Sequence, residues 1–171
     1  MNTLHIFDFD DTLVKSDAKV VITTQSGETR ELSSEEYAKY IKQPGDIEDF
    51  SDFDAYPQNP ELIEPVFSEF VDAINSDGLE NVVILTARSN PGPVRAFLIK
   101  NKIPLIHVEA VGSSDPFAKA RYILDRTMSD DSISAVRVFE DNVRNIRTII
   151  KTLKGTDIYL KTNRVRNGKI T

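Results

Sequence analysis

The sequence predicts an α/β fold built on a doubly wound, mostly parallel sheet of about five strands. Short apolar runs alternate with amphipathic segments, and from residue 82 onward the order is strand, helix, strand, helix, strand, helix, strand. Right-handed crossovers between such strands place helices on both faces of a sheet. The length of 171 residues suits one domain, residues 1–171, with a small flap or cap insertion at residues 14–59.

A strand and a β-hairpin open the chain. Residues 3–7 form a short apolar run that is typical of a strand. Residues 20–23 and 29–32 flank a turn in which Gly27 supplies a positive φ, so they indicate a hairpin. A short helix is then expected to begin at Ser34.

The rest of the insertion precedes the first long helix. We expect a loop from residues 44 to 57, and we interpret the insertion as a flap because it does not fit the strand–helix alternation. Within residues 60–75, apolar residues recur every four positions, which predicts an amphipathic helix. Asn59 and Pro60 suit its N-cap and first position, whereas Pro65 marks either a later start or a kink.

The carboxyl-terminal half supplies the rest of the predicted sheet. Residues 82–85 are continuously apolar, as in parallel strands that are buried on both faces. Asp115 and Pro116 suit the N-cap and first position of a helix. Further strands are expected at 105–111, 135–139 and 157–160, and helices at 93–101, 116–128 and 142–153.

Composition excludes several classes of protein. The chain has no cysteine, so disulfides, thiolate zinc sites and cysteine nucleophiles are excluded. A net charge of −6 disfavours binding to long nucleic-acid duplexes. No run of 18 apolar residues is present, and residues 1–9 lack the positively charged start of a signal peptide. We therefore expect a soluble cytoplasmic protein without a membrane partner; its oligomeric state is open.

Charge is unevenly distributed along the chain. Residues 46–80 contain 11 acidic residues and no basic one, whereas residues 151–171 contain six basic residues and one acidic residue. The two segments are either solvated surfaces of opposite sign, or the basic tail attracts an anionic substrate.

Polar residues follow the predicted strands where each strand ends. Carboxyl ends of parallel strands meet at one edge of a sheet, where ligands bind. The helix before the fourth strand adds a lysine in its first turn. The candidate site residues at this edge are therefore Asp8, Asp10, Asp11, Thr86, Arg88, Lys119, Glu140 and Asp141.

These residue types suit phosphoryl transfer. Asp8 and Asp10 are two residues apart and point the same way in an extended backbone. Converging carboxylates repel one another unless a cation neutralises them, and an oxygen-rich site suits Mg²⁺. Asp8 can then attack phosphorus while Asp10 serves as general acid and base. Lys119 and Thr86 are the candidates to hold the phosphoryl oxygens. Taken singly, each residue also has an ordinary structural explanation as a cap, turn or surface residue.

Four segments resemble the motifs of the haloacid dehalogenase (HAD) superfamily: Ile-Phe-Asp-Phe-Asp-Asp-Thr-Leu at 6–13, Val-Ile-Leu-Thr at 83–86, Lys119, and Val-Phe-Glu-Asp at 138–141. The resemblance implies a Rossmann-like fold and Mg²⁺-dependent hydrolysis of phosphomonoesters through an aspartyl phosphate. It makes Asp8 the nucleophile and Asp10 the general acid and base. It also implies that Asp8, the Asp10 carbonyl and Asp141 bind Mg²⁺, with Glu140 in support.

The substrate is less defined. Arg88 and Asp11 are the remaining candidates for substrate contacts, and Arg88 suits either a second phosphate or an acidic neighbour. The order Thr-Ala-Arg at 86–88 with a later acidic pair resembles the 3′-phosphatase domain of phage polynucleotide kinases. The expected partner is therefore a phosphorylated small molecule or a nucleic-acid end.

Two alternatives belong to other functional classes. Receiver domains of signalling proteins also gather acidic residues, a threonine and a lysine around Mg²⁺, but their phospho-acceptor aspartate ends the third strand. Here the third predicted strand ends in Ala-Val-Gly at 110–112, without an aspartate. The other alternative is a non-catalytic module of the same fold that only binds a partner.

Overall fold

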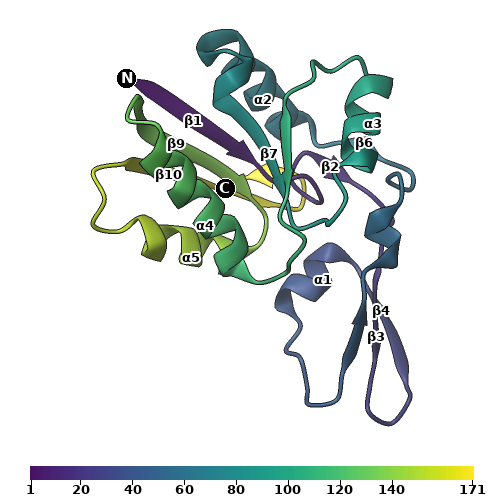
Figure 1. Ribbon diagram of the computed structural model, residues 1–171. Coiled ribbons are helices and arrows are strands. Elements are labelled where there is room, and N and C mark those ends of the chain that lie inside the picture. Colours follow the sequence, from purple (N-terminus) through teal and green to yellow (C-terminus); the bar gives the residue numbers. More distant parts are fainter.

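A six-stranded central sheet organises the protein, which the computed structural model describes over residues 1–171 (Figure 1). The sheet order is β11-β10-β9-β1-β7-β8, and all neighbouring pairs are parallel except β10 with β11. The strands are β1 (Asn2–Phe7), β7 (Val82–Thr86), β8 (His107–Ala110), β9 (Ile133–Glu140), β10 (Tyr159–Arg166) and β11 (Lys169–Ile170). The predicted α/β class with a mostly parallel sheet is confirmed.

Helices cover both faces of this sheet. One face packs against α2 (Glu64–Asp77) and α3 (Gly92–Lys100), and the other packs against α4 (Pro116–Ser129) and α5 (Val143–Leu153). The alternation of side chains along β1 divides them between two apolar clusters. Phe7 joins the cluster of α2 and α3, whereas Leu4 and Ile6 join that of α4 and α5. None of the protein's helices has the length and apolar character needed to cross a membrane.

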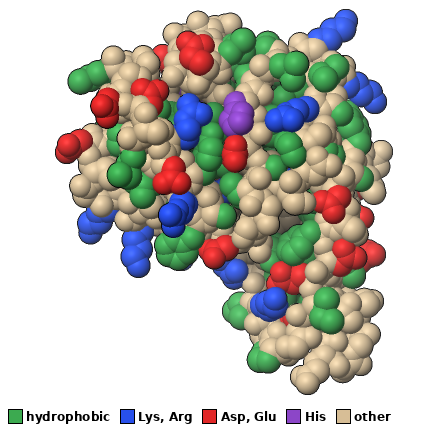
Figure 2. Space-filling model, viewed as in Figure 1, with side chains coloured by type: hydrophobic (Ala, Val, Ile, Leu, Met, Phe, Trp, Pro, Cys, Tyr) green, Lys and Arg blue, Asp and Glu red, His purple; other side chains and the backbone are tan.

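Residues 14–59, called the flap below, extend from the carboxyl edge of the sheet. The flap contains β2 (Val14–Lys15), β3 (Val20–Thr23), β4 (Thr29–Leu32), α1 (Ser34–Lys39), β5 (Ile47–Asp49) and a 3-10 helix, η1 (Ser51–Asp54). β3 lies between β4 and β5 in a small antiparallel sheet, and the β3–β4 turn uses Gly27 at φ 87°, as predicted. A small core of four buried residues, Ala18, Val20, Ile22 and Phe53, stabilises it. In Figure 2 the flap forms a lobe below the main body, with acidic side chains near the junction.

The structure corrects two expectations in and beside the flap. Residues 44–57 are not simply a loop, because they contain β5 and η1. The first long helix begins at Glu64 with Pro65 in its first turn, so the start at Asn59 and Pro60 is wrong and the later start indicated by Pro65 is confirmed. The reason is that β6 (Glu61–Leu62) pairs with β2, so the chain is extended where a helix was expected. The pairing of β2 with β6 brings together the start of the flap and the residues that closely follow its end.

The carboxyl terminus adds a sixth strand that was not predicted. The expected strand at 157–160 is longer and lies at Tyr159–Arg166. A turn at Asn167 and Gly168, both with positive φ, returns the chain as β11. Asn-Gly is a typical two-residue hairpin turn.

Candidate functional site

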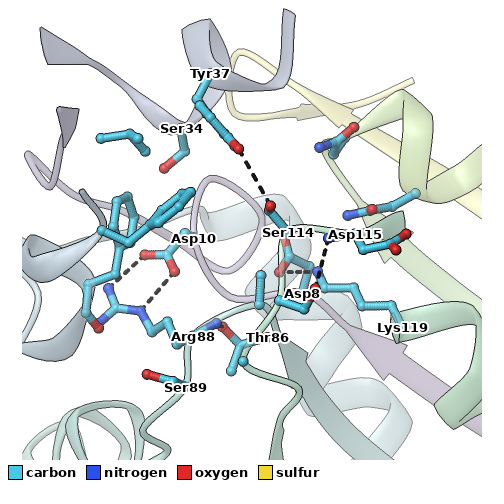
Figure 3. A pocket seen from close by; sticks show the side chains of 18 of the residues that line it. Asp8, Asp10, Ser34, Tyr37, Thr86, Arg88, Ser89, Ser114, Asp115 and Lys119 are labelled. Atoms are coloured by element: carbon cyan, nitrogen blue, oxygen red, sulfur yellow. Dashed lines mark hydrogen bonds and ion pairs between the residues drawn. The ribbon is translucent and has the colours of Figure 1, made fainter. Parts of the chain in front are cut away.

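A pocket of about 600 Å³ lies between the carboxyl edge of the sheet and the flap (Figure 3). Strands β1, β7 and β9, and the first turn of α4, bring most of the predicted site residues to its wall. Those that line it are Asp8, Asp10, Thr86, Arg88, Lys119, Glu140 and Asp141. Asp11 does not line this pocket and instead borders a second pocket.

Lys119 holds two buried carboxylates at the end of the sheet. Its Nζ lies 2.7 Å from Asp8 Oδ1 and 2.8 Å from Glu140 Oε2, and its side chain is almost fully buried. Burial lowers the pKa of Lys119, but Asp8 and Glu140 together outweigh burial and raise it. Burial raises the pKa of Glu140, but Lys119 outweighs burial and holds it below its usual value. Lys119 is therefore a charged amine fixed next to Asp8.

Thr12 connects the carboxylate of Asp8 to that of Asp141. Its hydroxyl lies 3.1 Å from Asp8 Oδ2 and 3.2 Å from Asp141 Oδ1, and the residue is fully buried. Thr12 is not among the residues predicted from the sequence, although its position four residues after Asp8 in the first motif is a signal for such a role. Thr12 thus orients two carboxylates that come from different strands.

Three of these carboxylates are close enough to bind one cation. Oxygen atoms of Asp8, Glu140 and Asp141 all lie within 4.8 Å of one another. Burial, and then the charges of its acidic neighbours, raise the pKa of Asp141 well above its usual value, and the same causes raise that of Asp8. One lysine does not neutralise three carboxylates, so the cluster favours a further cation. An all-oxygen donor set of this kind fits Mg²⁺.

Arg88 binds Asp10 and joins it to the flap. Its guanidinium donates to both carboxylate oxygens of Asp10 at 2.8 Å, and to the carbonyl oxygens of Phe53 at 2.7 Å and Ala55 at 3.0 Å. The Arg88 side chain is only 1% exposed. Of the two roles open to Arg88, the structure shows the pairing with an acidic neighbour. These contacts leave it little capacity to bind a second phosphate.

Removing Arg88 is expected to destabilise the fold. Arg88→Ala leaves Asp10 buried without its cation, and leaves two flap carbonyls without a donor. We expect a loss of about 3 kcal/mol in the free energy of unfolding, measured by urea denaturation. Arg95→Ala is the matched control, because Arg95 is exposed on α3 and has no ion pair. Equal stability of the two variants would contradict the structural role of Arg88.

Thr86, the last residue of β7, and Asp10, in the loop after β1, both line the pocket. The Thr86 side-chain oxygen accepts from the backbone N–H of Arg88 at 3.2 Å, which leaves the hydroxyl proton available to a ligand. Burial raises the pKa of Asp10, although Arg88 opposes this shift. A carboxyl group with a raised pKa is suited to proton transfer.

The flap supplies the opposite wall. Tyr37 and Phe50 contact each other edge to face, with ring centroids 5.3 Å apart, and both line the pocket. The Tyr37 hydroxyl lies 3.1 Å from Glu48 and 3.5 Å from the Ser114 hydroxyl, so it connects the flap to the loop before α4 (Figure 3). The flap therefore forms one wall of the pocket, and the contact between Tyr37 and Ser114 holds this wall to the main body.

Comparisons of the chain with protein-family models, with curated proteins and with solved structures found no match. The local arrangement of charged groups at the carboxyl edge of the sheet is therefore the basis for a functional proposal.

Proposed function

We propose that the protein is a Mg²⁺-dependent phosphomonoester hydrolase of the HAD type, which acts through an aspartyl phosphate. One observation carries this proposal. The carboxylate that ends the first strand, Asp8, lies in a pocket between a charged lysine and a second carboxylate, with Asp10 in the same pocket. A nucleophile, an acid and a phosphate-binding cation are thus close together.

Asp8 is the proposed nucleophile. One of its carboxylate oxygens attacks phosphorus, and the bond from phosphorus to the ester oxygen breaks. Asp10 gives its proton to the departing oxygen, so that an alcohol leaves. Asp10 then accepts a proton from the water that attacks the aspartyl phosphate, which releases inorganic phosphate and restores Asp8. Burial raises the pKa of Asp10, which suits the acid, but both Asp10 oxygens accept from Arg88 in this structure, so Asp10 must release one of these hydrogen bonds to carry the proton.

Lys119 and Thr86 are the proposed ligands of the phosphoryl oxygens. Lys119 Nζ lies within hydrogen-bond distance of Asp8, so an oxygen of a phosphoryl group on Asp8 lies within its reach. Asp8, the Asp10 carbonyl and Asp141 are the proposed Mg²⁺ ligands, and bound Mg²⁺ supplies neutralisation of the negative charge that gathers in the site. Glu140 is assigned to holding Lys119, because its two oxygens already accept from Lys119 and from the Asn142 N–H.

Phosphate release from a panel of esters tests the proposal. The panel contains an aryl phosphate, 5′- and 3′-mononucleotides, a sugar phosphate and a 3′-phosphorylated oligonucleotide. We expect release in Mg²⁺ from at least one monoester and none in EDTA, because the carboxylate cluster then lacks its neutralising cation. A bis-aryl phosphodiester is the control and is expected to stay intact. If no monoester is hydrolysed in Mg²⁺, the protein is not a phosphatase of this kind.

A further inference from the structure

A second pocket, of about 270 Å³, adjoins the first. Asp141 lines both pockets, and helix α1 of the flap contributes Tyr37 to the first and Lys39 to the second. Arg164 in the second pocket is the register partner of Glu140 on the neighbouring strand. Glu140 lines the first pocket, and neighbouring strands lie about 4.8 Å apart, so the walls of the two pockets meet where β9 and β10 pair.

Basic side chains without partners gather in this second pocket. Lys15, Arg164 and Arg166 line it, and none of their three side chains makes an ion pair or a hydrogen bond within the protein. Arg164 Nε is buried and has no hydrogen-bond acceptor. A buried donor without a partner is costly, and no group of the protein satisfies the guanidinium of Arg164 at this atom.

The carboxylates of the second pocket do not cancel these cations. Glu35 is already paired with Lys39 at 3.0 Å, and Asp141 belongs to the cluster proposed to bind Mg²⁺. Asp11 is the one remaining acidic group on the wall. Three unpaired cations therefore face one carboxylate, and the pocket attracts anions.

The first pocket has the opposite balance. Eight carboxylates line it against two cations, Arg88 and Lys119, and both cations are already paired. The pocket can hold the phosphoryl group under attack, but it offers no free cation to any further phosphate. If a substrate carries two phosphates, the unpaired cations of the second pocket are the better site for the second phosphate.

We propose that the second pocket binds a second phosphate of the substrate, next to the monoester that is hydrolysed. This deepens the proposed function and rests on it for the identity of the first phosphate. The substrate class is then a phosphomonoester with a nearby phosphodiester or second monoester. A nucleic-acid end and a small bisphosphate share this chemistry.

Kinetics with paired substrates test the pocket. The variant is Lys15→Ala with Arg166→Ala, two exposed residues outside the catalytic site. The control is Lys151→Ala with Lys154→Ala, which removes the same charge from exposed positions at the end of α5. We expect the pocket variant to raise KM about tenfold for a 3′-phosphorylated dinucleotide, a nucleoside 3′,5′-bisphosphate, or both, with kcat unchanged. KM for an aryl phosphate is expected to stay constant in all three proteins.

The pattern across substrates identifies the source of the second phosphate. An effect on the dinucleotide alone indicates a nucleic-acid end, and an effect on both indicates any second phosphate. Equal increases of KM for the aryl phosphate, or the same increases in the control variant, overturn the proposal.

Binding without turnover separates this inference from the proposed function. A fluorescent 3′-phosphorylated oligonucleotide is titrated with each protein in EDTA, and its anisotropy is measured at two salt concentrations. We expect the pocket variant to bind about tenfold more weakly than the wild type and the control variant, and to depend less on salt. If this holds while no monoester is hydrolysed, the hydrolase proposal fails and the anion site stands. If the wild type does not bind the probe, or binds no better than the pocket variant, the anion site fails.

Discussion

Asp8→Asn is expected to abolish phosphate release, with kcat lower by at least about 10⁴-fold. The amide cannot form the aspartyl phosphate, because its oxygen is a poor nucleophile. The amide oxygen can still accept from Lys119, and the amide occupies the same volume as the carboxylate. Lost activity is therefore expected without loss of fold, as measured by steady-state phosphate release beside circular dichroism.

Asp11→Asn is the matched control for this prediction. Asp11 has the same side chain and lies three residues further along the same motif, but it does not line the first pocket. Its φ of 59° is a backbone conformation that asparagine tolerates well. We expect activity on an aryl phosphate, which has no second phosphate for the pocket that Asp11 borders, to stay within a few-fold of the wild type. Substantial turnover by Asp8→Asn would exclude Asp8 as the nucleophile, and a large loss in Asp11→Asn would show that Asp11 acts in catalysis.

The site was largely predictable because sheet topology is a strong constraint. The polar residues that follow β1, β7 and β9 had to meet at one edge once these strands were parallel neighbours. Sequence alone did not show what Arg88 contacts. Its partners include the carbonyls of Phe53 and Ala55, which come from a flap segment expected to be loop. Such contacts depend on how the flap folds back over the sheet, which no local pattern encodes.

The position of Asp11 was also not predictable from the local sequence pattern. Its neighbour Asp10 faces the first pocket, whereas the positive φ of Asp11 turns the chain so that Asp11 borders the second. Burial, and then the charges of Asp10 and Asp8, raise the pKa of Asp11 to about 6.

The short strands β2, β5, β6 and β11 are not predicted from the sequence, because their conformation also depends on contacts with other segments of the chain. Each has only two or three residues, so its pairing partner rather than its own sequence determines its conformation.

Lys119→Met is expected to lower both stability and activity. Methionine fills a similar volume but leaves Asp8 and Glu140 buried without their cation. Removing one partner of a buried ion pair costs about 3–5 kcal/mol. The free energy of unfolding, measured by urea denaturation in EDTA, is therefore expected to fall by about that amount. Phosphate release in Mg²⁺ is expected to fall by about 10²–10³-fold, because the charge that stabilises the phosphoryl oxygens is gone.

A second substitution separates these two effects. Glu140→Gln removes one of the two carboxylates that Lys119 neutralises. The double variant Lys119→Met/Glu140→Gln therefore has one buried carboxylate without a cation, Asp8, whereas Lys119→Met alone has two. We expect the double variant to be more stable than the sum of the two single losses predicts, by about 1–3 kcal/mol, as for groups in direct contact. Activity is not expected to recover with stability, because no cation replaces Lys119 beside Asp8. Additive losses of stability would mean that the two side chains are not coupled in the folded protein, and recovery of phosphate release would mean that Lys119 serves the fold rather than the reaction.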